Sequence, residues 1–139
     1  TLPMVRLPVD LPRARLRETA AAALARLYLD LSFPPPGGWP AWFSDGLAGY
    51  AAARARGEGP SPREMAQRRS EAGRAGVLAV LRGDARDGAL ATALVAPLCH
   101  THVRPRLPNL LEMLRHRADA LSAIEITYGF TLDGLLAPP

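Results

Sequence analysis

Residues 39–50 read Trp-Pro-Ala-Trp-Phe-Ser-Asp-Gly-Leu-Ala-Gly-Tyr, and this stretch decides the fold expected for the chain. Its spacing of apolar and polar residues predicts a helix from about Pro40 to Arg56. The side chains that this helix is expected to bury are Trp42, Leu47 and Tyr50. Gly57-Glu58-Gly59-Pro60 ends the helix, and the run Pro34–Gly38 before it predicts a stiff, exposed connection to an earlier helix.

The composition favours helix over strand along the whole chain. Of the 139 residues, 48% are hydrophobic but only 6% are aromatic, so closely approaching helices with leucine as the main filler are expected. β-Branched residues are sparse, whereas Ala, Leu and Arg are abundant. This length is typical of one domain that buries a core without disulfides or metals.

Further helices are predicted on both sides of residues 39–50. One runs from Arg13 to about Leu31, and its buried stripe is expected to consist of Leu16, Ala20, Ala23, Leu24, Leu27 and Leu31. Ser61-Pro62-Arg63-Glu64 starts another helix, with the serine as its N-cap. A helix kinked at Pro97 is predicted from Asp87 to about His102.

The last third of the chain predicts short helices. One is expected from about Pro108 to Ala118. A second opens at a capping box formed by Ser122-Ala123-Ile124-Glu125 and closes at Gly129. Thr131 is expected to cap one last turn.

Residues 1–12 contain three prolines and alternate only partly between apolar and polar, which is typical of an extended arm or an edge strand. The predicted fold is therefore all-α: a compact bundle of five to seven helices over residues 13–139, with the arm before it.

The quoted stretch also resembles the segment that carries the third zinc ligand in gluzincin metallopeptidases, whose pattern is close to Trp-Leu-Ser-Glu-Gly-Leu-Ala-x-Tyr. Residues 87–136 are similar to the C-terminal helices of peptidase-MA-like domains, most of all in Leu94–Leu98 and Tyr128–Leu132. The resemblance covers most of residues 13–136. It implies the helical part of a gluzincin domain, a family whose members are typically secreted or envelope proteins of bacteria.

Carried over residue by residue, the resemblance implies a lost metal site. A gluzincin binds zinc with two histidines four residues apart on one helix and a later Glu, and a Glu beside the first His is the general base. The corresponding positions here are Arg17, Ala21 and Asp45, with Glu18 as a vestigial base. Arginine keeps its proton and alanine has no ligand atom, so neither zinc nor another cofactor is expected.

The same alignment suggests that an ion pair replaced the metal. Arg17 would then occupy the vacated position and pair with Asp45, and also with Glu18. The alternative is that Arg17 and Glu18 are ordinary solvent-facing helix residues.

Two other groups of residues are candidate sites. Cys99-His100-Thr101-His102 is the only cluster of soft metal ligands; on a helix, positions 99 and 102 share a face that position 100 does not, so the end of a helix is the favoured interpretation. Trp39, Trp42 and Tyr50 form a candidate groove, although aromatic residues at helical spacing more often lie in the core.

The charge pattern does not favour nucleic acid as a partner. The net charge is +4, with a sequence pI near 10.2, and all 17 basic residues are arginine, which suggests a GC-rich coding genome. The densest basic stretch, from Arg54 to Arg74, has no interleaved aromatic residue, so a solvated helix face is expected there. No membrane-spanning helix is predicted. The single cysteine, Cys99, allows no internal disulfide and says nothing of the compartment.

The function expected from the sequence is that of a catalytically inactive metallopeptidase-like domain that binds a protein partner or serves as a scaffold. One alternative is an active zinc hydrolase with ligands from His100, His102, His116 and Asp45. The other is an arginine-rich helical module that binds a polyanion.

Overall fold

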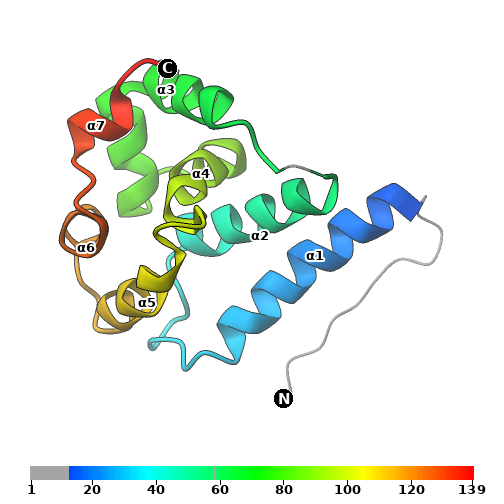
Figure 1. Ribbon diagram of the computed structural model, residues 1–139. Coiled ribbons are helices and arrows are strands. Elements are labelled where there is room, and N and C mark those ends of the chain that lie inside the picture. The colour runs from blue at the N-terminus through cyan, green and yellow to red at the C-terminus, as the bar shows by residue number, and fades with distance from the viewer. Residues whose placement is uncertain (1–12, 58) are drawn as a thin grey trace.

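The computed structural model describes residues 13–57 and 59–139, and over these residues the chain forms helices and no strand (Figure 1). The all-α prediction is confirmed, with seven α-helices in the described part. The predicted arm at residues 1–12 lies outside it. The α-helices are α1 (Arg13–Asp30), α2 (Ala41–Ala55), α3 (Pro62–Arg82), α4 (Gly88–Val95), α5 (Leu107–Arg115), α6 (Ala120–Tyr128) and α7 (Leu132–Leu136), with 3₁₀ helices η1 (Ala96–Cys99) and η2 (Arg104–Arg106).

Helix α2 lies between α1 and α4, and α4 in turn packs on α3 (Figure 1). Glycines on α2 make the approach to α4 close. A Cβ atom added to Gly46 would lie 2.4 Å from the carbonyl oxygen of Ala91, and one added to Gly49 would lie 2.1 Å from Oγ1 of Thr92. Helix α4 can therefore pack this closely on α2 only because Gly46 and Gly49 have no side chain.

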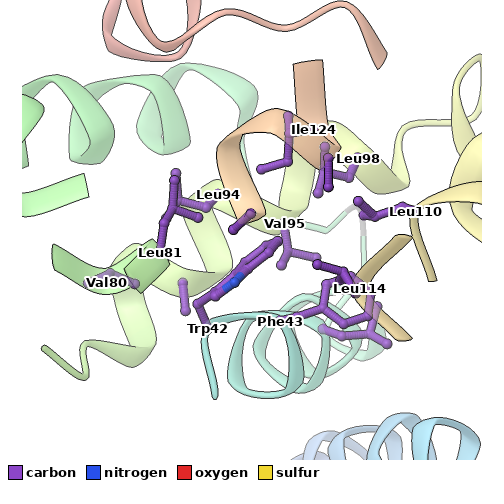
Figure 2. Packing of buried hydrophobic residues seen from close by; sticks show 14 of the residues in the cluster. Trp42, Phe43, Val80, Leu81, Leu94, Val95, Leu98, Leu110, Leu114 and Ile124 are labelled. Atoms are coloured by element: carbon purple, nitrogen blue, oxygen red, sulfur yellow. The ribbon is translucent and has the colours of Figure 1, made fainter. Parts of the chain in front are cut away.

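The core is built where α2, α3, α4, η1, α5 and α6 meet (Figure 2). It consists mainly of leucine, isoleucine and valine side chains together with the ring of Phe43, which solvent does not reach. Each fully buried side chain of this size contributes about 1.5–3 kcal/mol through removal of apolar surface from water. The largest of the fully buried residues are Phe43, Leu29, Leu94, Leu98, Leu110, Ile124, Val77 and Val95.

Several helix ends follow the local signals in the sequence. The side chain of Ser61 accepts a hydrogen bond from the backbone N–H of Glu64, and Thr131 accepts one from Gly134. Gly129 ends α6 in the left-handed conformation, with φ of 77°. Gly73 interrupts α3 with φ of 71° and ψ of 178°, which kinks that helix.

Two predicted helix boundaries are wrong. The helix expected to reach His102 ends at Val95, and η1 follows it; Pro97 in that turn has no N–H for an α-helical hydrogen bond. The capping box expected at Ser122 does not form, because α6 begins earlier. Asp119 is its N-cap and accepts a hydrogen bond from the backbone N–H of Ser122 at 3.1 Å.

The predicted buried stripe of α1 is also wrong. Leu24 and Leu31 are 58% and 62% exposed, whereas Leu29, which the prediction left out, is buried. Helix α1 packs mainly on one neighbour, α2. The inner side of α1 carries small residues such as Ala22 and Ala25 together with Leu29, whereas Leu24 lies on the outer side.

The connection between α1 and α2 is held in place rather than fully exposed. Arg115 on α5 donates hydrogen bonds to the carbonyls of Ser32 and Phe33, each at 2.7 Å. Arg117 donates to the carbonyl of Pro36 at 2.8 Å, and Pro35 is buried. These contacts fix the connection from which α2 runs back along α1.

Candidate functional site

Asp45 lies in the second turn of α2, and its side chain is only 11% exposed. Both carboxylate oxygens bind guanidinium groups. Arg86 donates from Nε to Oδ2 at 2.8 Å and from Nη2 to Oδ1 at 3.0 Å, and Arg26 donates from Nη2 to Oδ1 at 3.3 Å. The hydrogen bonds from Arg86, and secondarily those from Arg26, hold the pKa of Asp45 below its usual value against the opposing effect of burial.

This cluster, the Asp45 ion pair, joins three parts of the fold. Arg26 comes from the second half of α1, and Arg86 comes from the loop between α3 and α4. Arg26 also donates to Oγ of Ser44 at 3.1 Å. Because Arg86 binds through two parallel N–H donors, the pair has directional strength that a single contact lacks. The ion pair therefore ties α1 and the α3–α4 loop to the start of α2.

The prediction that Arg17 pairs with Asp45 is wrong. Arg17 is exposed, and Glu18 forms an ion pair with Arg56 at 3.5 Å, near the end of α2. The reason is the antiparallel course of α1 and α2, which brings the first half of α1 to the last turn of α2 and Arg26 to its first turns. The alternative prediction of an ordinary solvent-facing residue fits Arg17 but not Glu18.

The residues of α1 that line the space beside α2 are Glu18, Ala22 and Arg26, each four residues from the next. Positions 17 and 21 do not line this space. Ala22 and Arg26, which have the spacing of a histidine pair, do line it, five residues further along the chain than the positions named from the sequence. Of the two, Arg26 contacts the carboxylate of Asp45.

A cleft opens at this point between α1, α2 and the N-terminal ends of α3 and α4, with a volume of about 920 Å³. We call it the Asp45 cleft. Its floor consists of small residues, among them Ala48, Gly49, Ala52 and Thr92, and a chain bound there can approach the helix backbones closely. Its charged lining carries both signs: Glu18, Arg26, Asp45, Arg56, Glu64 and Arg68.

The three aromatic residues of the candidate groove do not share one cavity. Trp42 is 3% exposed and belongs to the core, as the alternative interpretation predicted. Trp39 donates from Nε1 to the carbonyl of Leu29 at 2.7 Å, and the guanidinium of Arg115 lies 5.7 Å from its ring centre. The two tryptophans line a cavity of about 520 Å³ beside Pro35–Ala41, and Tyr50 lines a different one.

The histidines are spread over separate segments. His100 and His102 follow η1, with ring centres 5.2 Å apart, whereas Nε2 of His116, the residue just after α5, lies 2.8 Å from Oε1 of Glu112. Cys99 is buried, and burial raises the pKa of its thiol to about 11. The helical face that Cys99 and His102 were expected to share does not exist, because η1 ends at the cysteine. In the described part of the chain, no three His, Cys, Asp or Glu residues are placed to hold a metal ion.

Arg69 is a residue whose role the sequence did not indicate. It belongs to the basic stretch that was expected to lie on a solvated face, yet it is only 9% exposed. Its Nε donates to the carbonyl of Leu135 at 2.8 Å and its Nη1 to the carbonyl of Ala93 at 2.6 Å. No sequence signal identifies it, because its partners are backbone groups 24 and 66 residues away.

Comparisons of the chain with protein-family models, with curated proteins and with solved structures find no match. Over the described residues, no helix has both the length and the apolar character needed to cross a membrane.

Proposed function

We propose that this chain is a catalytically inactive relative of the gluzincin metallopeptidases that binds an extended segment of a protein partner in the Asp45 cleft. The observation that carries the proposal is the Asp45 ion pair. Asp45 stands where the resemblance places the third zinc ligand, and two guanidinium groups occupy both of its oxygens. A cation bridge between α1 and α2 takes the place that the metal holds in the family.

The α1 side of the same site supports this proposal. The positions of α1 that line the Asp45 cleft with the spacing of two helical ligands include Ala22 and Arg26, and Arg26 contacts Asp45. Neither residue can donate a lone pair to zinc. Glu18, the vestigial base in the sequence alignment, pairs with Arg56 at the far end of α2. It therefore does not stand beside Asp45, where a general base would be needed.

The shape of the Asp45 cleft supports a peptide as the ligand. The small residues on its floor leave room for main-chain atoms, and charges of both signs along its sides can fix the direction of a bound segment. The volume of about 920 Å³ lies toward the upper end of the range typical of ligand sites. Because Asp45 and Arg26 both line the cleft, a bound segment would lie against the position that corresponds, in this proposal, to the metal of the gluzincins.

The test selects peptides from a random displayed library on the full chain and measures their affinity for two variants. Ala52→Trp fills the floor of the cleft, whereas Ala75→Trp changes an exposed residue of α3 that lines none of the cavities described above. We expect at least a tenfold loss of affinity for Ala52→Trp and no change for Ala75→Trp. The peptides should stay intact when they are incubated with the chain and zinc. Equal binding by both variants, or zinc-dependent cleavage, would contradict the proposal.

A further inference from the structure

The guanidinium of Arg69 is a buried charge that no described carboxylate compensates. None of the described Asp or Glu side chains forms an ion pair with it within 4.0 Å. Burying an unpaired charge is costly. In agreement with this, burial lowers the pKa of Arg69 from its ordinary value.

Two carbonyl groups compensate this charge in part. Leu135 and Ala93 lie in the last turns of α7 and α4, where helix carbonyls lack intrahelical partners and carry partial negative charge. They accept from Nε and Nη1 of Arg69. Nη2 forms no hydrogen bond within the described part of the chain, and it is not fully closed off from solvent. The two N–H donors of Nη2 are therefore left for something else.

Nη2 belongs to a side chain that lines a cavity of about 440 Å³, which we call the Arg69 cavity. This volume is within the range of small-molecule sites. The walls are mainly apolar and aromatic, with Tyr50, Met65, Pro97 and Phe130 among them. Among the polar side chains that also line it are those of Arg54 and His100. None of the described residues that line it is acidic.

We propose that the Arg69 cavity binds a carboxylate joined to an aromatic or branched apolar group. The carboxylate accepts from Nη2 of Arg69 and offsets its residual charge, and Arg54 adds a second cation at the opening. The apolar group packs against Tyr50, Pro97 and Phe130. The mainly apolar lining favours an anion with a hydrophobic body over a strongly hydrated anion such as phosphate, which would lose its water shell without apolar contacts in return. This proposal is independent of the one for the Asp45 cleft.

Two sources supply such a group: a free carboxylic acid, or the C-terminal carboxylate of a chain that ends in an apolar residue. The experiment titrates the full chain with phenylacetate and with its neutral analogue phenylacetamide, and follows backbone amide signals by NMR. N-Acetyl-Gly-Phe with a free C-terminus is titrated alongside its C-terminal amide. We expect each acid to bind at least tenfold more tightly than its amide, with the largest shifts at residues that line the cavity.

The variant for this test is Thr101→Phe. Thr101 lines the cavity but is exposed, so the new ring closes the opening while Arg69 keeps its structural hydrogen bonds. Binding should fall at least tenfold without a lower melting temperature. Tighter binding of the peptide acid identifies a chain terminus as the ligand, and tighter binding of phenylacetate identifies a free acid. The proposal is wrong if acids and amides bind equally, if Thr101→Phe binds as the wild type does, or if inorganic phosphate binds as tightly as phenylacetate.

Discussion

Replacing Gly46 by alanine tests how closely α2 and α4 pack beside the candidate site. The added Cβ would lie 2.4 Å from the carbonyl oxygen of Ala91 and 2.4 Å from Cγ2 of Val95, about 1 Å short of ordinary van der Waals contact. The valine side chain can rotate, but the carbonyl belongs to the backbone of α4. Relief of the clash therefore requires the two helices to separate.

The expected magnitude is the difference between two opposing terms. Alanine in a helix interior is favoured over glycine by about 0.8–1.0 kcal/mol. Overpacking a core costs about 1–3 kcal/mol, and a clash with backbone belongs at the upper end of that range. Gly46→Ala should thus lower the free energy of unfolding by about 2 kcal/mol. For a chain of this size the melting temperature falls by roughly 6–10 °C.

The matched control is Gly76→Ala on α3. There the nearest atom to the added Cβ is Cβ of Ala72 at 3.2 Å, a tight contact that a shift of a few tenths of an ångström relieves, so the net change should be small and no larger than the propensity gain of about 1 kcal/mol. Urea unfolding of both variants, followed by circular dichroism, gives the two free energies. Changes of the same sign and size in Gly46→Ala and Gly76→Ala would refute the close packing described for α2 and α4.

Three further predictions concern single side chains. Asp45→Asn should lower the free energy of unfolding by only about 1–2 kcal/mol, since solvent partly screens the exposed arginines. Because the pKa of Asp45 is lowered in the folded state, the wild type should keep its full advantage above the unfolded-state pKa of Asp45 and lose it as the pH falls through the folded-state pKa. Equal stability of the two proteins at pH 7 would rule this out. The thiol of Cys99, with a pKa of about 11, should not react with a disulfide reagent at pH 8 until the chain is unfolded in guanidinium, and rapid reaction of the native protein would show that the thiol is not buried. Asp119→Ala should lower the free energy of unfolding by about 1 kcal/mol through loss of the α6 N-cap, and Ser122→Ala should lower it less. A larger loss for Ser122→Ala would instead support the capping box that the sequence predicts at Ser122.

The helices themselves follow from local chemistry, which is why the sequence predicts them. Ser61, Gly129 and Thr131 act on backbone groups within a few residues of their own position. The error at Asp119 is of the same local kind, because two N-cap signals lie three residues apart and the earlier one is used.

The candidate site was less predictable because its contacts join distant segments. Arg26 and Arg86 reach Asp45 across 19 and 41 residues, and which turn of α1 faces Asp45 depends on how α1 lies along α2. The buried stripe of α1 was misplaced for the same reason, since Leu29 is buried while Leu24 and Leu31 are exposed. Arg69 is the extreme case, because its partners are backbone carbonyls that carry no sequence signature.

The proposed relation to gluzincins is tested most directly by placing zinc ligands at α1 positions that line the Asp45 cleft. The variant Ala22→His/Arg26→His/Asp45→Glu places two histidines four residues apart opposite a carboxylate, and Arg86→Ala frees that carboxylate. The control carries Arg17→His and Ala21→His with the same Asp45→Glu and Arg86→Ala changes. Zinc per chain is measured by mass spectrometry after exposure to stoichiometric zinc and desalting, with folding checked by circular dichroism. We predict one zinc in the first variant and none in the control or the wild type; no zinc in a folded first variant, or zinc in the wild type, would contradict the inactive-peptidase proposal.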